Sequence, residues 1–222
     1  MKIKDFWYKE YHTFKKLDKE GKKHFIWDYY RIPIFVLCLV IVLIIGQVIY
    51  SAGNRNICYA VFVNAFESSQ NPLDQLYHQQ EGSKKRDHVS VSVSYQLDPD
   101  DSAMASTNAS SMEGLATLFG VGDLDIFAAD PTVFDMYADK DAYEDLTEIL
   151  GDDFLKENNA EIYTYTTDSG KKVSGGIWLR KGSPLHKAGY YTNDVLIGIA
   201  RRAQNRDEAI EIIKALIVEN QH

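Results

Sequence analysis

Cysteine is scarce in this 222-residue chain: only Cys38 and Cys58 occur, with no C-x-x-C pair and no neighbouring histidine cluster. Cys38 lies inside a long apolar run and Cys58 follows that run, so no disulfide framework is expected. The same pattern gives no support for a zinc module built on cysteine. The chain is instead long enough to fold around one well-filled hydrophobic core.

Strong catalytic and nucleotide-binding motifs are also missing. The chain contains no G-x-S-x-G, P-loop, H-E-x-x-H or G-x-G-x-x-G motif. No nucleophile or carboxylate partner is visible for the histidines that follow the apolar run: His78, His88, His186 and His222. We therefore predict no catalytic residues, no metal site and no cofactor, and a protein that is not an enzyme.

One stretch of the chain lacks charge altogether. Residues 32–50 read IPIFVLCLVIVLIIGQVIY, which is 19 residues without a charged side chain and with Gln47 as the one plainly polar residue. A helix of this length spans about 30 Å, the thickness of a bilayer's hydrocarbon core. Pro33 falls in the first turn, where its missing N–H is tolerated. We predict a transmembrane helix at 32–51; the alternative of a buried core helix is disfavoured because helices of soluble proteins keep a polar stripe.

Charge is unevenly divided on the two sides of this run. Residues 1–31 carry nine Lys/Arg and five acidic residues, a net charge of +4, whereas the remainder carries −12. The positive-inside rule then predicts a single-pass protein of the cell membrane, with a cytoplasmic N-terminus and an extracytoplasmic C-terminal domain. A cleaved signal peptide is the alternative, but its charged N-terminal region would be unusually long and SAGN is a poor cleavage site.

The cytoplasmic segment, residues 1–31, mixes lysines with aromatic residues. Trp7, Tyr11 and Phe14 are spaced to share one face of a helix. Such a basic, aromatic segment can lie on the anionic inner leaflet of the membrane. It can equally be a tail that only sets the topology. Nucleic acid is not an expected partner, because that would need more positive charge and a defined fold.

Residues 52–57 are predicted to be a linker, and residues 58–222 an extracytoplasmic domain. Within that domain Cys58–Phe66, Leu124–Asp130 and Val195–Ala200 are apolar on both alternating faces, which is typical of strands covered by helices on both sides.

The rest of the domain supplies the other elements of an α/β fold. His88–Leu97 alternates strictly between apolar and polar residues and is predicted to lie nearer a sheet edge. Residues 161–179 are predicted to form a small hairpin that turns at Asp168, Ser169 and Gly170. Asn205 is predicted to cap a final helix. Because strands alternate with helices, we predict an α/β fold with a mainly parallel sheet and helices on both faces.

Three segments carry a resemblance to a known family. LDIFAADPTVFDMYADKDAYEDLTEIL (124–150), GGIWLRKGSPL (175–185) and VLIGIARRAQNRDEAIEIIKAL (195–216) resemble segments of the extracytoplasmic solute-binding proteins of bacterial ABC importers. The resemblance implies a periplasmic-binding-protein-like fold. Members of that family close two lobes around a ligand, whereas the space between Leu155 and Val195 is sufficient for a hairpin and a loop but not for a second lobe. For this chain the resemblance therefore implies a single lobe plus the small hairpin.

Candidate binding residues follow from where ligands sit in open α/β sheets, beyond the carboxyl ends of the strands. Ser68 and Ser69 follow the first predicted strand and Asp130 ends the third. Trp178 could stack on a sugar or a cation. These four residues are the predicted ligand-binding set. Each also has a structural reading: the serines as loop or capping residues, Asp130 as a helix N-cap, and Trp178 as part of the core.

A single lobe cannot enclose most of a ligand's surface as a two-lobed clamp does. The sequence therefore predicts a membrane-anchored, non-enzymatic extracytoplasmic protein with a solute-binding-protein-like domain. Its expected partner is another membrane protein or a transporter, for which it would be an interaction or accessory subunit. The alternative is a receptor that binds a small solute (a sugar, peptide or amino acid) for an ABC importer. An unrecognised hydrolase is a third hypothesis.

Overall fold

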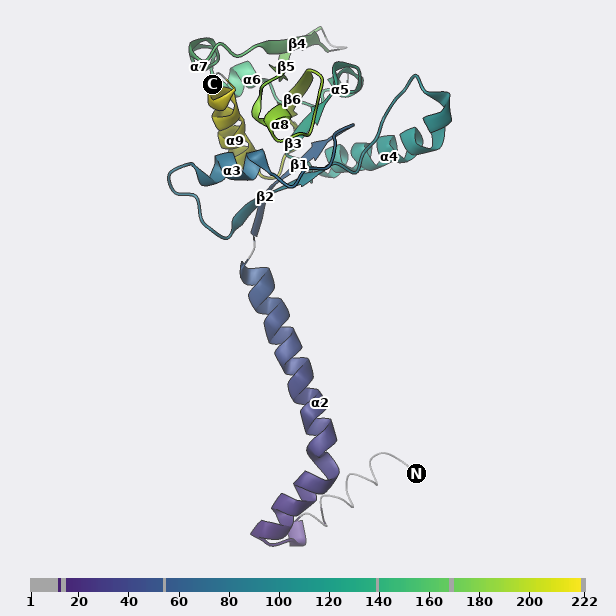
Figure 1. Ribbon diagram of the computed structural model, residues 1–222, viewed down its shortest axis with the longest axis vertical. Helices are drawn as coiled ribbons and strands as arrows, with labels where there is room; N and C mark the ends of the chain where they lie inside the picture. The colour runs from purple at the N-terminus through teal and green to yellow at the C-terminus, as the bar shows by residue number, and fades with distance from the viewer. Residues whose placement is uncertain (1–11, 13–14, 54, 139, 168–169, 221–222) are drawn as a thin grey trace. The chain divides into compact units, whose positions relative to one another are not determined.

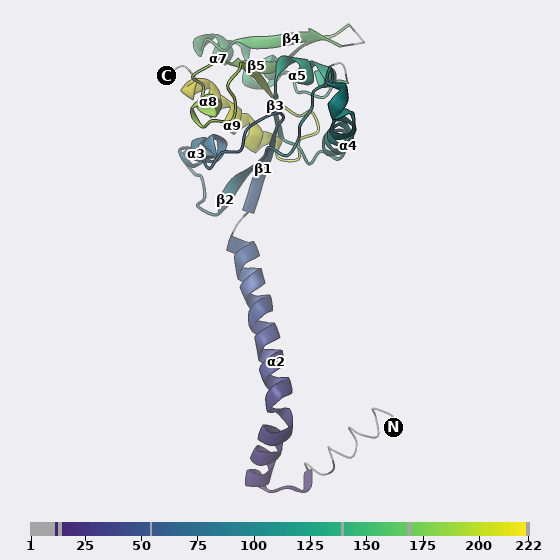
Figure 2. The same ribbon diagram turned by 45° about the vertical axis from the view of Figure 1, so that its right-hand side comes forward.

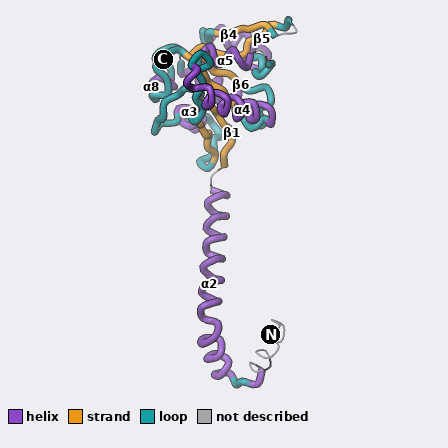
Figure 3. Tube along the Cα trace, turned by 90° about the vertical axis from the view of Figure 1, so that its right-hand side faces the viewer, coloured by secondary structure: helices purple, strands orange, loops and turns teal. Residues whose placement is uncertain are grey.

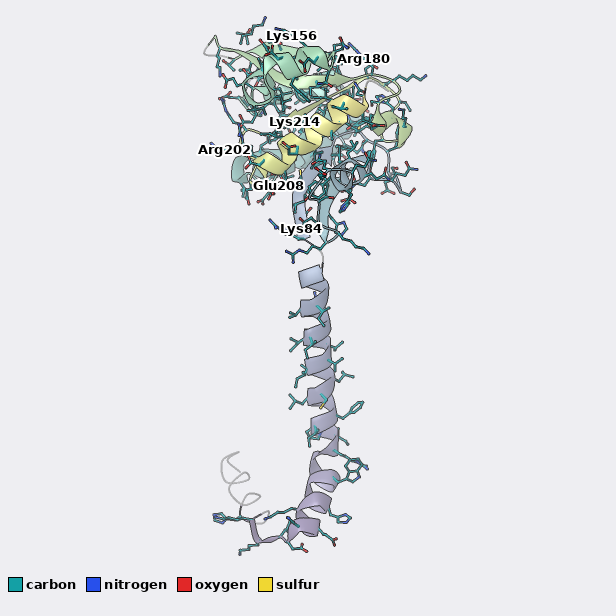
Figure 4. All side chains as sticks on the ribbon, turned by 90° about the vertical axis from the view of Figure 1, so that its left-hand side faces the viewer. Lys84, Lys156, Arg180, Arg202, Glu208 and Lys214 are labelled. Atoms are coloured by element: carbon teal, nitrogen blue, oxygen red, sulfur yellow. The ribbon has the colours of Figure 1, made fainter. Side chains whose placement is uncertain are left out.

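The computed structural model describes residues 12, 15–53, 55–138, 140–167 and 170–220. The chain divides into two units, Met1–Gly53 and Asn54–His222. The first unit contains helix α2 (Lys19–Gly53). Its residues Arg31–Ile49 are long and apolar enough to cross a membrane, and none of them is buried; side chains project from both sides of the helix (Figure 4). The predicted aromatic face of Trp7, Tyr11 and Phe14 lies outside the described residues.

Helix α2 is longer than the predicted transmembrane segment. It starts at Lys19 and continues through Gly53, and strand β1 (Arg55–Phe62) follows at once. Most of the predicted linker, residues 52–57, therefore belongs to the end of the helix or to the start of the strand. The strand begins early because Arg55 and Asn56 gain backbone partners from a neighbouring strand, where they pair with Asp87 and His88.

The second unit is built on a six-stranded sheet in the order β2-β1-β3-β6-β5-β4 (Figure 1). The remaining strands are β2 (Asp87–Ser92), β3 (Ile126–Ala129), β4 (Ile162–Thr166), β5 (Lys172–Leu179) and β6 (Val195–Ile199). β1 pairs in parallel with β2 and β3, whereas the pairs β3–β6, β6–β5 and β5–β4 are antiparallel. The sheet is mixed, which corrects the prediction of a mainly parallel one. An apolar strand buried on both faces satisfies either direction, so the sequence pattern could not distinguish them.

Helices cover both faces of this sheet, as predicted (Figure 2). One face packs against α3 (Pro72–His78), α6 (Leu146–Leu150), α7 (Asp152–Glu157), α8 (Pro184–Lys187) and α9 (Arg206–Glu219). The other face packs against α4 (Ala105–Val121) and α5 (Pro131–Ala138). A short 3-10 helix, η1 (Ser102–Met104), precedes α4. The fold class is therefore α/β.

The predicted hairpin at 161–179 corresponds to strands β4 and β5, which pair antiparallel (Figure 3). It is not a separate appendage, because β5 also pairs with β6 and so joins the hairpin to the main sheet. Of the predicted turn residues, Asp168 and Ser169 lie outside the described residues, and Gly170 has a φ of 81°. That positive φ suits glycine, which has no Cβ to clash there.

Candidate functional site

The carboxyl ends of β1 and β3 meet at a point where the chain reverses its progress across the sheet. From β1 the chain passes through α3 to β2 on one side, and then returns through α4 to β3 on the other side of β1. Open α/β sheets bind ligands in the crevice at such a switch point. Asn64 and Asp130, which follow these two strands, lie here.

Asn64 connects the loops that leave the two strands. Its backbone has a φ of 57°, in the left-handed region that asparagine tolerates better than most residues. Its side-chain oxygen accepts a hydrogen bond from the Leu97 N–H at 2.8 Å, and its Nδ2 donates to the Leu97 carbonyl at 2.7 Å and to Asp130 Oδ2 at 3.0 Å. The Asn64 side chain thus bonds both the N–H and the carbonyl of Leu97, as a neighbouring strand's backbone would, and it orients the Asp130 carboxylate.

Asp130 has a second structural role at the start of α5. Its Oδ1 accepts a hydrogen bond from the Val133 N–H at 3.0 Å, which satisfies one of the free N–H groups of the first helical turn. The structural reading of Asp130 as an N-cap is therefore present in the fold. The same side chain also lines a cavity of about 400 Å³, together with Asn64, Asp98, Asp100 and Met104.

The cavity has a polar wall of carboxylates, because Asp98, Asp100 and Asp130 all line it. Its volume falls in the range of small-molecule sites. At the same strand ends, the buried Tyr191 hydroxyl lies 3.0 Å from the Val63 carbonyl and 3.1 Å from the Ala128 carbonyl, and so joins the ends of β1 and β3. Burial raises the pKa of Tyr191 well above its ordinary value, and the negative charge of Asp130 adds to the effect.

Ser68 and Ser69 lie in the loop after β1, and Ser68 has contacts that explain it structurally. Its hydroxyl donates to the Ala188 carbonyl at 2.7 Å and accepts from the Gln70 N–H at 3.1 Å, so it fixes this loop against the residue that follows α8. Ser69 is exposed. Neither serine is among the residues that line the cavity at Asp130.

Trp178 stacks on a cation, as its residue type allows, but the cation is supplied by this chain. The Arg180 guanidinium lies 4.3 Å from the centre of the indole ring. Arg180 also forms ion pairs with Glu161 and, at 2.8 Å, with Asp194, and these hydrogen bonds raise its pKa. Trp178 is half-buried and packs edge-on against Tyr163 at 6.3 Å. The indole face covered by Arg180 is thus already occupied.

The register of the sheet places Trp178 and Asp130 at the same edge. Ala129 pairs with Leu196, and Leu196 pairs with Trp178, so the three lie in one row across β3, β6 and β5. Even so, the cavity is lined by Asp130 and not by Trp178. The structure therefore brings Trp178 and Asp130 to one edge without joining them in one pocket.

The histidines have partners that the sequence did not reveal. His186 Nδ1 lies 2.7 Å from the Ser183 hydroxyl, and its Nε2 lies 2.7 Å from the Asn193 carbonyl. Because a carbonyl can only accept, Nε2 carries the proton and Nδ1 accepts from Ser183. Ser183 is only 2% exposed, so this pair stabilises the loop between β5 and β6 and does not present a nucleophile to solvent.

His78 and His88 both lie against one carboxylate, that of Asp74. The distances are 3.8 Å from His78 Nε2 to Asp74 Oδ2 and 3.6 Å from His88 Nδ1 to Asp74 Oδ1. The prediction that these histidines lack a carboxylate partner was therefore wrong. A sequence signal did exist for two of the three residues, because Asp74 and His78 are four residues apart, the spacing at which side chains on a helix are neighbours. His88 comes from a strand, and only the tertiary fold brings it to them.

No protein-family model, curated protein or solved structure matches this chain. The relationship to solute-binding proteins therefore remains a hypothesis based on the three quoted segments.

Proposed function

We propose that this protein is a single-pass membrane protein whose α/β domain lies outside the cytoplasm and serves as a non-enzymatic interaction or accessory subunit of a membrane or transport complex. The observation that carries the proposal is helix α2, whose segment Arg31–Ile49 is strongly apolar and has no buried residue. An exposed apolar surface of this length is unfavourable in water and matches a bilayer core.

The orientation is supported by charge. The +4 charge of residues 1–31 and the −12 charge of the rest follow the positive-inside pattern. Two exposed lysines allow a direct test: Lys84, in the α/β domain, and Lys16, which precedes α2. Each is replaced by cysteine in a chain with Cys38→Ser and Cys58→Ser, and intact cells are treated with a membrane-impermeant maleimide.

We expect labelling of Lys84→Cys in intact cells, and labelling of Lys16→Cys only after the membrane is permeabilised. The reverse pattern would contradict the orientation. A tag at the N-terminus distinguishes an anchor from a cleaved signal peptide, because an anchor keeps the tag and the domain in one band on a gel. Loss of the tag from the mature band would overturn the proposed anchor.

The accessory role is supported by the compactness of the second unit. Residues 54–222 form one unit, and β4, β5 and β6 all belong to its single sheet. The segment between Leu155 and Val195, where a second lobe would be inserted, contributes strands to that sheet instead. Because the described residues of the domain form no second lobe, a partner protein is the most direct way to cover the carboxylates Asp98, Asp100 and Asp130 at the ends of β1 and β3. Cross-linking in membranes followed by purification in detergent tests this, and recovery of this protein alone would count against a partner.

The alternative function, a small-solute receptor, is favoured by the cavity beyond the carboxyl ends of β1 and β3. Its carboxylates Asp98, Asp100 and Asp130 suit a ligand that carries an amino group, such as an amino acid or a peptide, better than an anionic one. A thermal-shift screen with amino acids, peptides and sugars at millimolar concentration tests the idea. Stabilisation should be lost in Asp130→Asn, which keeps the N-cap acceptor but removes the charge. No stabilisation by any of these solutes in the unmodified protein would exclude this function.

A further inference from the structure

Asp74, His78 and His88 form a cluster at the edge of the sheet where α3 lies beside β2 (Figures 1 and 2). Asp74 and His78 share one face of α3, and His88 is the second residue of β2. The two imidazole rings lie 5.8 Å apart, measured between ring centres, in an edge-to-face arrangement. Three metal-ligating side chains from two elements thus converge on one point.

The distances within this cluster are close to those of a metal site. One potential ligand atom from each residue lies within 4.8 Å of the other two. In a tetrahedral zinc site the metal–ligand bonds of about 2.0–2.1 Å place neighbouring ligand atoms about 3.4 Å apart. The ligand atoms are therefore at most about 1.4 Å further apart (4.8 − 3.4) than a tetrahedral zinc ion requires.

The carboxylate is already held in place by the backbone of β2. Asp74 Oδ1 accepts a hydrogen bond from the Val89 N–H at 2.8 Å, and Asn71 Nδ2 donates to the Val89 carbonyl at 2.6 Å. Asn71 also accepts from the backbone N–H of Asp74 at 3.2 Å. These bonds satisfy the outer backbone groups of an edge strand. They also fix the orientation of Asp74, as second-shell hydrogen bonds do for metal ligands.

The cluster is partly open to solvent, and a further carboxylate, Asp87, precedes His88 in β2. The side chains of Asp74, His78 and His88 are 25%, 30% and 43% exposed. Asp87, the neighbour of His88, is buried, and its Oδ1 accepts no hydrogen bond among the described residues, with Arg86 Nε 3.9 Å away. A buried carboxylate without full compensation favours a cation nearby.

We propose that Asp74, His78 and His88 bind a divalent transition-metal ion, with Zn²⁺ as the expected occupant. Two imidazoles and one carboxylate favour Zn²⁺, Ni²⁺ or Cu²⁺ over Mg²⁺ and Ca²⁺, which prefer oxygen ligands. Three protein ligands leave one position of a tetrahedral ion for water or for a ligand from a partner. The competing explanation is that Asp74 only forms surface ion pairs with protonated histidines, which contribute little to stability.

The test uses the full chain in detergent without a histidine tag. Isothermal titration with Zn²⁺ should give one ion per chain. His78→Ala and His88→Ala should each weaken binding at least tenfold. His24→Ala, which removes an imidazole from α2 outside the cluster, should leave the affinity unchanged. Far-UV circular dichroism of each variant confirms that the fold is retained.

A second readout identifies the ligands. Co²⁺ bound by this set should show visible d–d absorption of a low-coordinate, nitrogen-containing site, and the band should disappear on addition of Zn²⁺. Asp74→Asn keeps an acceptor for the Val89 N–H while removing the charge, so it should weaken binding without unfolding the edge. No stoichiometric Zn²⁺ binding, equal binding in His78→Ala and the unmodified chain, or a preference for Mg²⁺ or Ca²⁺ would each overturn the proposal. The result does not depend on the topology proposed above.

Discussion

A buried carboxylate, Asp125, connects three parts of the α/β domain, and its removal should be among the most destabilising single changes in the chain. Asp125 is 0% exposed. Its Oδ2 accepts hydrogen bonds from the Tyr59 N–H at 2.8 Å and from Asn205 Nδ2 at 3.0 Å, and its Oδ1 accepts from the Asn205 N–H at 2.9 Å. It therefore joins β1, the start of β3 and the N-terminus of α9.

The expected magnitude follows from these bonds. In Asp125→Ala the backbone N–H groups of Tyr59 and Asn205 lose their acceptor, and each such buried group costs about 1–3 kcal/mol. The Asn205 side chain is only half-buried and can turn to water. We therefore expect a loss of about 3–5 kcal/mol, a large part of the 5–15 kcal/mol that is typical for a domain. In urea, at about 2 kcal/mol per molar, this shifts the unfolding midpoint down by about 2 M.

The assay is equilibrium unfolding of residues 54–222, the unit that contains the whole sheet and its core. Trp178 is the only tryptophan in this unit, so its fluorescence reports unfolding together with far-UV circular dichroism. Asp125→Asn should lie between the wild type and Asp125→Ala, because one oxygen remains and an NH₂ group faces the Asn205 N–H.

Asp123→Ala is the matched control, two residues earlier in the chain. Asp123 is exposed and accepts one surface hydrogen bond, from Gln204 Nε2 at 2.8 Å. Its loss should change stability by less than about 0.5 kcal/mol. A cost for Asp125→Ala below about 1 kcal/mol, or one equal to that of Asp123→Ala, would refute the argument that the buried acceptors of Asp125 hold these elements together.

Three further predictions concern single residues of the same domain. Burial raises the pKa of Tyr137 from 10.0 to about 12. Its stabilising contribution is therefore complete below pH 10 and is lost as the pH rises through 12, by roughly 3 kcal/mol. In pH-dependent urea unfolding, Tyr137→Phe should lose less stability between pH 10 and 12 than the unmodified domain, and the buried Tyr143 and Tyr191 account for the loss that remains. A Cβ on Gly198 would lie 2.4 Å from the Gly175 carbonyl oxygen, whereas one on Gly120 in α4 would meet nothing within 4 Å. Gly198→Ala should thus lower the melting temperature, and Gly120→Ala should leave it unchanged or raise it, since alanine is favoured over glycine in a helix by up to about 1 kcal/mol. Asn64→Ala should lower the free energy of unfolding in urea by about 2–3 kcal/mol, through lost hydrogen bonds and backbone strain. Asn64→Gly should be more stable than Asn64→Ala, because glycine removes the strain at this positive φ, but it still lacks the hydrogen bonds. Equal stability of the alanine and glycine variants at position 64 would argue against a strained backbone there.

The sequence was most informative where a local pattern is compatible with only one kind of structure. The apolar run predicted a helix long enough to span a membrane, because 19 uncharged residues give no polar face to a helix. The α/β class was also predictable, since apolar strands at Cys58–Phe66, Leu124–Asp130 and Val195–Ala200 alternate with helical segments. Asp130-Pro131 correctly predicted the start of α5, because the N-cap and the proline that follows it act within one turn.

Local patterns misled where a side chain serves a distant partner. Asn205 was predicted to cap α9 with its own side chain, and it does precede the helix, but its amide binds Asp125 across the fold instead of making a capping bond. The local sequence around Asn205 is the same in either case. A residue 80 positions earlier, which no local pattern connects to it, decides the outcome.

The sequence by itself thus determined the apolar helix, the charge difference on its two sides and the α/β class, because each depends on residues close together in the chain. Only the tertiary structure decided the direction of β6 in the sheet, since a strand buried on both faces reads the same either way. The fold also decided which polar residues meet: Asn64 with Asp130, Ser183 with His186, and Asp74 with both His78 and His88. Most of these contacts join different elements, and it is the pairing of strands and the packing of helices that set their distances.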